Sequence, residues 1–314
     1  MDLLTYAGNL DNLSDIQEKE SRKKPNKKRY RFLLGDICDT VLVDEIFKKH
    51  KPDIVVNFAA ESHVDWSIID SRYFFRTNLI GVHNLVDLVI KHKITRFIQI
   101  STDEIYGDVL EGESNEEFRI NPSNPYSASK AAADLLVQSY IRSYKLPALI
   151  IRGSNNYGPY QYPEKLIPLS ITNLLEGQKI PIHGSGRQQR RWLFVDDFCK
   201  AIDLIMQKGK DSSIYNVAGI EMTNINMIKE ICKTLKLDYR KMTHYINDRA
   251  GGDRRYAPDG SRIKKDLGWK PEYQISDGLG AVVEWYLRNT KWWKKVRNTY
   301  EFKTRYKKIY KSEY

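Results

Sequence analysis

Tyr126 and Lys130 are separated by three residues at the start of a segment with helical character. Positions i and i+4 share one face of a helix, so we expect the Lys130 ammonium to lie beside the Tyr126 phenol. A free phenol has a pKa near 10 and is a poor base at neutral pH, but a nearby cation favours the phenolate. A bound nicotinamide cation would act in the same direction. The pair therefore predicts a base that takes a proton from a substrate hydroxyl while hydride leaves the same carbon.

Other reactive groups precede this pair, at the end of an apolar strand predicted over 97–100. Ser101 and Thr102 end the strand, and Asp103 and Glu104 follow directly. Tyr-x-x-x-Lys alone is a common surface spacing, but a strand, a hydroxyl and then this spacing form a more specific order. The carboxyl end of a central strand faces the crevice where open α/β sheets bind ligands. The two acids therefore either act on a substrate or only cap the next turn.

The order of these motifs resembles the extended short-chain dehydrogenase/reductases. Within that group, Ser-Thr-Asp-Glu-x-Tyr-Gly at 101–107 is similar to the nucleotide-sugar 4,6-dehydratases, and the resemblance runs from Asp2 to about Trp293. It implies a hydro-lyase that oxidises C4 of a nucleoside diphosphate glucose with NAD, eliminates water across C5 and C6, and returns hydride to C6. The overall match favours the dTDP sugar as substrate and rhamnose synthesis as the destination of the product.

Five catalytic residues follow from the resemblance. Tyr126 would take the C4 hydroxyl proton, aided by Lys130 and by a hydrogen bond from Thr102. Glu104 would remove the C5 proton, and Asp103, kept protonated, would assist departure of the C6 hydroxyl. Crowding of two carboxyl groups favours opposite protonation states.

The resemblance also implies which residues contact NAD and substrate. Besides Tyr126 and Lys130, the NAD contacts are Asp2, Leu3, Leu4, Thr5, Asp36, Ile37, Phe58, Ala59, Ala60, Glu61, Ser62, Thr77 and Asn156. The substrate contacts are Ser62, Thr102, Asn155, Lys165, Leu166, Pro181, Ile182, His183, Arg190, Asn224, Asp248 and Arg249. Arg190 and Arg249 would bind the diphosphate through their planar guanidinium groups, and a neutral His183 ring would stack near the base.

Several positions depart from the family pattern. Trp66 stands where Arg is usual, Arg191 where Asp is usual, and Gly252 where His is frequent. No G-x-x-G-x-x-G segment precedes a helix, although such a turn cradles the pyrophosphate at a helix N-terminus. We therefore expect a misplaced start codon or an incomplete gene, and poor NAD binding by a chain that is truncated in life.

The expected fold class is α/β, with a Rossmann-like, doubly wound parallel sheet that lacks its first strand. We expect a cofactor domain over 1–155, a smaller mixed α/β substrate domain over 156–293, and a basic, aromatic tail over 294–314 that docks on the body. The segments expected to be strands are 31–37, 54–60, 97–100, 148–152 and 180–184, and those expected to be helical are 41–50, 70–92 and 126–144.

Charge and composition bound the partners. The net charge is +11, but the 19–31 run holds eight Lys or Arg and one Glu, and the 291–314 run holds nine and two. These runs are either a solvated loop and a docked tail, which we expect, or a patch for nucleic acid or an anionic surface. We predict no nucleic-acid partner and no membrane partner, because no apolar run is long enough to span a bilayer.

The three cysteines are scattered along the chain and indicate buried thiols in a reducing compartment, so we expect a cytoplasmic protein. The six histidines show no metal-ligand spacing, so we expect no metal. By resemblance, the helices at 70–92 and 126–144 would pair in a homodimer as a four-helix bundle. Three alternatives stay open: a UDP-glucose 4,6-dehydratase, a nucleotide-sugar 4-epimerase or decarboxylase, and an inactive truncated binding or scaffold protein.

Overall fold

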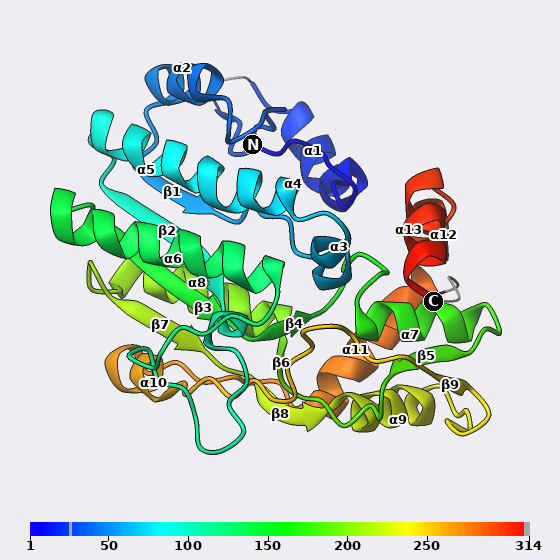
Figure 1. Cartoon of the computed structure of the whole chain (residues 1–314). Helices are drawn as coiled ribbons and strands as arrows, with labels where there is room; N and C mark the ends of the chain where they lie inside the picture. Colours follow the sequence, from blue (N-terminus) through cyan, green and yellow to red (C-terminus); the bar gives the residue numbers. More distant parts are fainter. Residues whose placement is uncertain (25–26, 311–314) are drawn as a thin grey trace.

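The computed structural model describes residues 1–24 and 27–310, and a sheet of four parallel strands in the order β1-β2-β3-β7 lies at its centre (Figure 1). The strands are β1 (Ile54–Asn57), β2 (Arg96–Thr102), β3 (Ala148–Gly153), β4 (Asn155–Tyr157), β5 (Ile180–His183), β6 (Gln189–Phe194), β7 (Ile214–Val217), β8 (Ile220–Thr223) and β9 (Thr243–Ile246). The α-helices are α1 (Ser14–Ser21), α2 (Thr40–His50), α3 (Val64–Ile69), α4 (Arg72–Phe75), α5 (Val82–Lys91), α6 (Pro125–Tyr144), α7 (Leu166–Leu175), α8 (Val195–Lys208), α9 (Asn224–Thr234), α10 (Ser261–Leu267), α11 (Ile275–Arg288), α12 (Thr290–Arg297) and α13 (Tyr300–Tyr310).

Both faces of the central sheet are covered by helices, as is usual for parallel strands. Successive side chains of a strand point to opposite faces. Ala148 and Ile150 pack with α5 and α6, which lie side by side over one face (Figure 1). Leu149 and Ile151 pack with α8 and α10 on the other face. The α/β architecture of parallel strands between helix layers is therefore confirmed.

Helix α6 begins where its capping residues dictate. The Asn124 side chain accepts from the Ser127 backbone N–H, the Ser127 hydroxyl faces back to the Asn124 N–H, and Pro125 occupies the first helical position. Proline is favoured there because its missing N–H would have no helical partner. This start places Tyr126 in the first turn, directed at the end of β2.

A second group of elements forms beyond the central sheet. Strands β4, β6 and β8 make a three-stranded sheet with parallel and antiparallel pairs, and β5 and β9 form a parallel pair. Helices α7, α9 and α11 enclose a separate apolar cluster with these strands. The mixed sheet departs from strict alternation of strand and helix, as the sequence predicts for this part of the chain.

The strand expected over 31–37 is wrong. Only Leu34 forms a bridge, with Asp2, through hydrogen bonds from Asp2 N–H to the Leu33 carbonyl and from Gly35 N–H to the Asp2 carbonyl. Two such bonds to a short N-terminal segment do not make a ladder. The strand expected over 54–60 ends at Asn57. Among the described residues, β1 pairs with β2 alone and is therefore an edge strand.

The two basic runs are more structured than a loop and a tail. Helix α1 includes the first residues of the 19–31 run, which corrects the expected solvated loop there, and Pro25 and Asn26 lie outside the described residues. The tail forms α12 and α13 and buries Trp293 and Phe302, so the expected docking is confirmed up to Tyr310. Residues 311–314 lie outside the described part of the chain.

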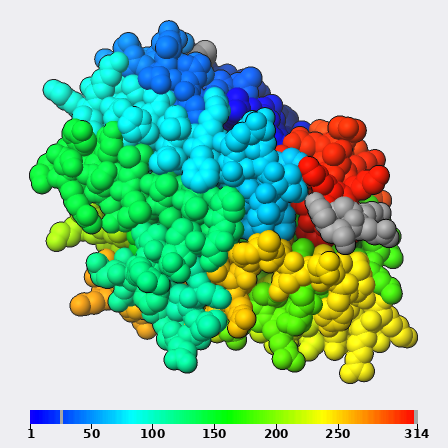
Figure 2. All heavy atoms as spheres, in the orientation of Figure 1, coloured from blue at the N-terminus to red at the C-terminus, as the bar shows by residue number. Residues whose placement is uncertain are grey.

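The two ends of the chain meet. Lys295 pairs with Asp11, and the Trp292 indole donates to Asn12. Figure 2 shows the C-terminal residues, in red, beside the blue N-terminal part. Of the three cysteines, Cys199 is exposed, contrary to the expectation of buried thiols. No helix in the described ranges is long and apolar enough to cross a membrane.

Candidate active site

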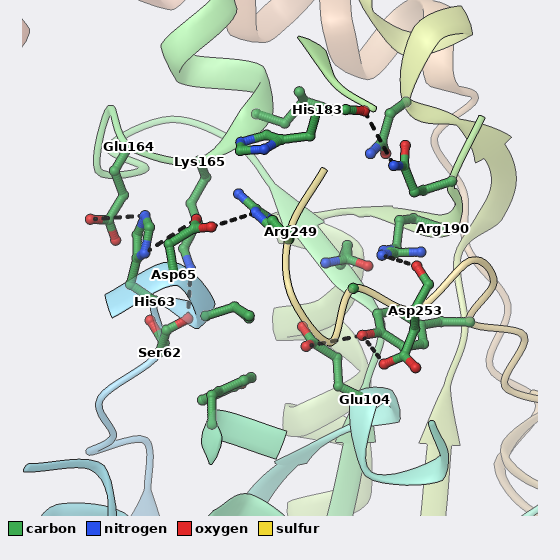
Figure 3. Close-up of a pocket in the computed structure, with 18 of the residues that line it drawn as sticks. Ser62, His63, Asp65, Glu104, Glu164, Lys165, His183, Arg190, Arg249 and Asp253 are labelled. Carbon is green, nitrogen blue, oxygen red and sulfur yellow. Dashed lines mark hydrogen bonds and ion pairs between the residues drawn. The ribbon is translucent and has the colours of Figure 1, made fainter. Parts of the chain in front are cut away.

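A pocket of about 390 Å³ opens at the carboxyl ends of β2 and β3 and extends to β5, β6 and the loop at 248–253. Its size suits a ligand larger than a single sugar, since pockets for small molecules span about 300–1,000 Å³. Figure 3 labels pocket residues that follow β2 (Glu104) and that belong to β5 (His183), to β6 (Arg190) and to the loop at 248–253 (Arg249 and Asp253). Of the substrate contacts expected from the sequence, all twelve line this pocket: Ser62, Thr102, Asn155, Lys165, Leu166, Pro181, Ile182, His183, Arg190, Asn224, Asp248 and Arg249.

Both acids line the pocket, with Asp103 buried and Glu104 half-buried. Thr102 ends β2 and caps the following turn by accepting from the Glu104 N–H. The side-chain cap is therefore the threonine and neither acid, and both acids line the pocket. Burial and the neighbouring Glu104 charge raise the pKa of Asp103 well above its ordinary value. Burial also raises the pKa of Glu104, while the charges of Arg190 and Lys165 oppose that rise. The pocket therefore favours a protonated Asp103 beside a more readily ionised Glu104.

Tyr126 lines the same pocket, but its environment differs from the expectation. Burial and then the Glu104 charge raise the pKa of the Tyr126 phenol, and a hydrogen bond from Thr102 lowers it. The Lys130 ammonium donates to the Ile100 carbonyl at 2.6 Å, and burial lowers the pKa of Lys130 to about 8. Burial therefore disfavours the phenolate, and the expected lowering of the phenol pKa by Lys130 and a bound nicotinamide stays a prediction.

Two residues that the sequence did not single out complete the acidic end. The Tyr256 hydroxyl lies 2.7 Å from Asp253 and 3.4 Å from Glu104, and Ser123 also donates to Asp253. Figure 3 shows Asp253 beside Glu104 and Arg190. Both residues lie in the Asp248–Tyr256 segment, whose charged composition was the available signal, but only folding shows that the segment returns to the end of β2.

Arg190 and Arg249, the two residues expected to bind the diphosphate, have different partners in the pocket. Arg190 donates to the carbonyls of Gln189 and Asp253 and stacks on Tyr256, with its guanidinium carbon 4.1 Å from the ring centroid. Arg249 pairs through Nε with Asp65 at 2.7 Å. Both guanidinium groups line the pocket and keep further N–H donors, because each carries five.

At another end of the pocket two aromatic rings meet. The His183 ring lies 5.8 Å from that of Tyr310, the last described residue, and its Nδ1 lies 3.2 Å from the Asn247 carbonyl. Burial and the Arg249 charge lower the pKa of His183 to about 4, so the ring is neutral at pH 7. Tyr310 was missed by the sequence analysis, because nothing local links the tail to β5.

Polar atoms with no protein partner occur among the residues that line the pocket together with Tyr126. Ser101 Oγ, Asn155 Oδ1 and Asn156 Oδ1 are buried and lack a hydrogen bond within the described chain. A buried polar atom without a partner is costly, so such atoms indicate where a polar ligand binds. These acceptors fit the amide donors of a nicotinamide carboxamide.

The remaining expected NAD contacts lie away from this pocket. Asp2 bridges to Leu34, Asp36 pairs with Arg76, and Ile37 packs in the core under α5. The Phe58 side chain is 58% exposed beyond the end of β1. Leu3, Leu4, Thr5, Ala59, Ala60, Glu61 and Thr77 are likewise outside the residues that line the pocket, so their role in holding a cofactor stays a prediction.

The departures from the family pattern have structural partners. Arg191 forms ion pairs with Glu113 and Glu221, so its charge has partners in this structure. The Trp66 ring lies under two cations of α13, with the Arg305 guanidinium carbon 4.4 Å and the Lys308 ammonium 5.1 Å from its centroid.

Comparison with known proteins gives a consistent result. The family model described as GDP-mannose 4,6 dehydratase matches residues 2–282. The chain is 42% identical over 299 residues to a dTDP-glucose 4,6-dehydratase of Streptomyces niveus, covering 95% of this chain and 86% of the relative. It is 43% identical over 328 residues to a dTDP-glucose 4,6-dehydratase of Shigella flexneri, covering 96% and 89%.

The fold is shared with a solved structure of the same kind. The dTDP-glucose 4,6-dehydratase of Streptomyces venezuelae, solved with NAD bound, superposes with a TM-score of 0.89 and 40% sequence identity. The match covers 94% of this chain and 88% of that one.

Proposed function

The chain belongs to the nucleotide-sugar 4,6-dehydratases of the extended short-chain dehydrogenase/reductases, and we propose that it converts dTDP-glucose into dTDP-4-keto-6-deoxyglucose with the pocket residues in the roles given below. The observation that carries the proposal is the meeting of Thr102, Asp103, Glu104 and Tyr126 in one pocket. A phenol and two unequal carboxyl groups are what oxidation at one carbon and elimination across the next two require.

The cofactor is NAD, which when bound accepts hydride from C4 and returns it to C6. The unpartnered Ser101, Asn155 and Asn156 oxygens support binding of its carboxamide next to Tyr126. The positive charge of the oxidised nicotinamide favours the phenolate of Tyr126, which opposes the effect of burial.

In the first half of the reaction, Tyr126 removes the C4 hydroxyl proton and Thr102 hydrogen-bonds to the phenol oxygen. Lys130 is a positioning residue, because its ammonium fixes the Ile100 carbonyl at the end of β2. In the second half, the C4 ketone acidifies C5, so that its proton can be removed as an enolate forms. Glu104 takes the C5 proton, and the protonated Asp103 gives its proton to the leaving C6 hydroxyl, which departs as water. Glu104 returns its proton to C5 when hydride is added at C6, and Asp103 regains a proton from solvent as the Tyr126 phenol loses one.

The direct experiment is incubation of the purified full chain with dTDP-glucose and NAD, with mass spectrometry of the product. Loss of one water and appearance of a ketone are expected. The content of NAD in the purified protein is measured alongside, because a chain without cofactor would support the alternative of an inactive binding protein. A product of unchanged mass and inverted C4 configuration would support the epimerase alternative.

Tyr126→Phe is expected to lower kcat by about 10²–10⁴-fold, the range of a lost general base. The ring and its packing stay, so circular dichroism should match the wild type. Tyr144→Phe is the matched control, since Tyr144 lies on the same helix, is 62% exposed and is far from the pocket. A Tyr126→Phe protein with more than a tenth of wild-type kcat would exclude the phenol as the base.

The pH dependence of kcat/KM is expected to be bell-shaped. Glu104 must be ionised and its pKa is raised, so the rate falls as pH drops through that raised pKa. Asp103 must be protonated and its pKa is raised further, so the rate falls as pH rises through it. The apparent pKa values of the two limbs belong to the coupled pair of Asp103 and Glu104 and not to either residue alone. Full activity persisting below about pH 4, the ordinary glutamate pKa, would contradict these roles.

The relatives support dTDP-glucose as the substrate. Comparison of kcat/KM for dTDP-glucose and UDP-glucose tests the choice. A preference for UDP-glucose would assign the chain to the UDP alternative.

A homodimer through α5 and α6 is the assembly implied by family resemblance. Apolar side chains exposed on α4, on the π-helical turn at Arg76–Gly81 and on α6 support it, among them Tyr73, Ile80 and Leu135. Light scattering after size exclusion should give twice the chain mass, and Leu135→Glu should give a monomer.

A further inference from the structure

Arg305 of α13 lies between two aromatic rings from distant parts of the chain. Its guanidinium carbon is 3.8 Å from the ring centroid of Tyr6 and 4.4 Å from that of Trp66. The side chain is 16% exposed. A planar guanidinium stacks on both rings at once, which an ammonium does not do. Arg305 therefore joins the N-terminal segment, α3 and the C-terminal helix at one point.

The same helix reaches the pocket. Phe302, Tyr306 and Tyr310 follow each other at intervals of four residues, so they lie on one face of α13. The row ends with Tyr310 beside His183. Arg305 precedes Tyr310 by five residues, about 7.5 Å along the helix axis, so the stacked guanidinium fixes the helix just before it enters the pocket.

Both residues that hold Arg305 are linked to residues of the pocket wall. The Tyr6 hydroxyl donates to Glu164 at 2.9 Å, and Glu164 lines the pocket next to Lys165. The backbone N–H of Trp66 donates to Nδ1 of the buried His63 ring at 3.4 Å, and His63 also lines the pocket. One residue before Trp66, Asp65 pairs with Arg249 on the pocket wall (Figure 3). Arg305 also affects the electrostatics, because its charge lowers the pKa of Glu164, which burial raises to about 7.

We propose that Arg305 is a positioning residue whose stacking between Tyr6 and Trp66 holds α13 closed over the substrate pocket and thereby sets the affinity for the nucleotide. The inference rests on the proposed function only in naming the nucleotide as dTDP. Arg305 touches none of the reacting groups, so its loss affects binding and leaves the chemical step alone.

The test is Arg305→Gln in the full chain. KM for dTDP-glucose and the dissociation constant of dTDP, measured by calorimetry, are each expected to rise about tenfold, which is a loss of about 1.4 kcal/mol. We expect kcat to stay within about twofold. Backbone amides of 300–310 should exchange hydrogen faster, because the helix is no longer fixed. A merely structural role would lower Tm without this separation of KM from kcat.

Further variants make the result specific. Trp66→Leu should reproduce the effect, and Arg305→Gln with Trp66→Leu should add less than the two single changes, as residues in contact do. Arg305→Lys keeps the charge and loses the planar stacking, so it should rescue only part of the affinity. Lys303→Gln is the matched control, since Lys303 is exposed on the same helix, and should match the wild type.

The proposal is overturned if Arg305→Gln binds dTDP within about twofold of the wild type and exchanges at 300–310 at the wild-type rate. It is also overturned if Arg305→Lys restores full affinity, because the charge alone would then suffice. Neither dTDP binding nor hydrogen exchange requires turnover. A wild-type chain that binds dTDP but makes no ketosugar would therefore contradict the proposed function and leave this inference standing.

Discussion

Glu104→Gln is expected to lower the rate of water loss by about 10²–10⁴-fold while C4 oxidation continues. The amide fills the same volume at the end of β2 and cannot accept the C5 proton. Oxidation depends on Tyr126 and Thr102, which the substitution leaves in place. The variant should therefore accumulate reduced cofactor and a 4-ketoglucose of unchanged 6-hydroxyl, detected by absorbance and mass spectrometry after a single turnover.

A matched control is Glu111→Gln, an exposed carboxylate on the loop after the same strand, which should keep wild-type kcat. If Glu104→Gln released the C4 epimer at the wild-type rate, the acids would have no part in an elimination and the epimerase alternative would replace the dehydratase. If Glu104→Gln lost C4 oxidation and elimination together, Glu104 would be needed for both steps and the assigned division of roles would be wrong.

Asp134→Asn is expected to lower the free energy of unfolding by about 3–5 kcal/mol, because it leaves the buried Arg152 charge without its partner. Arg152 meets Asp134 through Nε at 3.0 Å and Nη2 at 2.8 Å, with side-chain exposures of 1% and 0%. Its Nη1 donates to the Tyr106 hydroxyl and the Glu116 carbonyl. The network ties β3 to α6 and to the turn that carries the acidic pair.

Urea denaturation followed by circular dichroism measures this loss. The control is Arg72→Gln, which breaks an ion pair of the same 2.8 Å length in which Arg72 is 86% exposed, and which should cost less than about 1 kcal/mol. A loss below about 1 kcal/mol for Asp134→Asn would show that the interior relaxes around the charge. Asp134→Leu with Arg152→Met should recover much of the stability, since an apolar pair of similar volume carries no desolvation penalty.

Part of the candidate site follows from local sequence patterns, and part depends on contacts between distant segments. Thr102, Asp103 and Glu104 follow a strand, and Tyr126 starts a capped helix, so their neighbourhood follows from the rule that parallel strands end at one edge of a sheet. The pKa of Tyr126 did not follow. Burial of the phenol and then the Glu104 charge raise that pKa, and burial depends on how the whole chain packs.

What the sequence by itself determined is therefore the α/β class, the helices and strands with strong periodicity, and the reactive residue types at strand ends. These depend on patterns within about twenty residues, where side-chain period and capping act directly. Tertiary structure alone decided that Asp253 and Tyr256 face Glu104, and that Arg305 lies between Tyr6 and Trp66. Those contacts join residues 149 to 299 positions apart, and only packing of the whole chain brings such segments together.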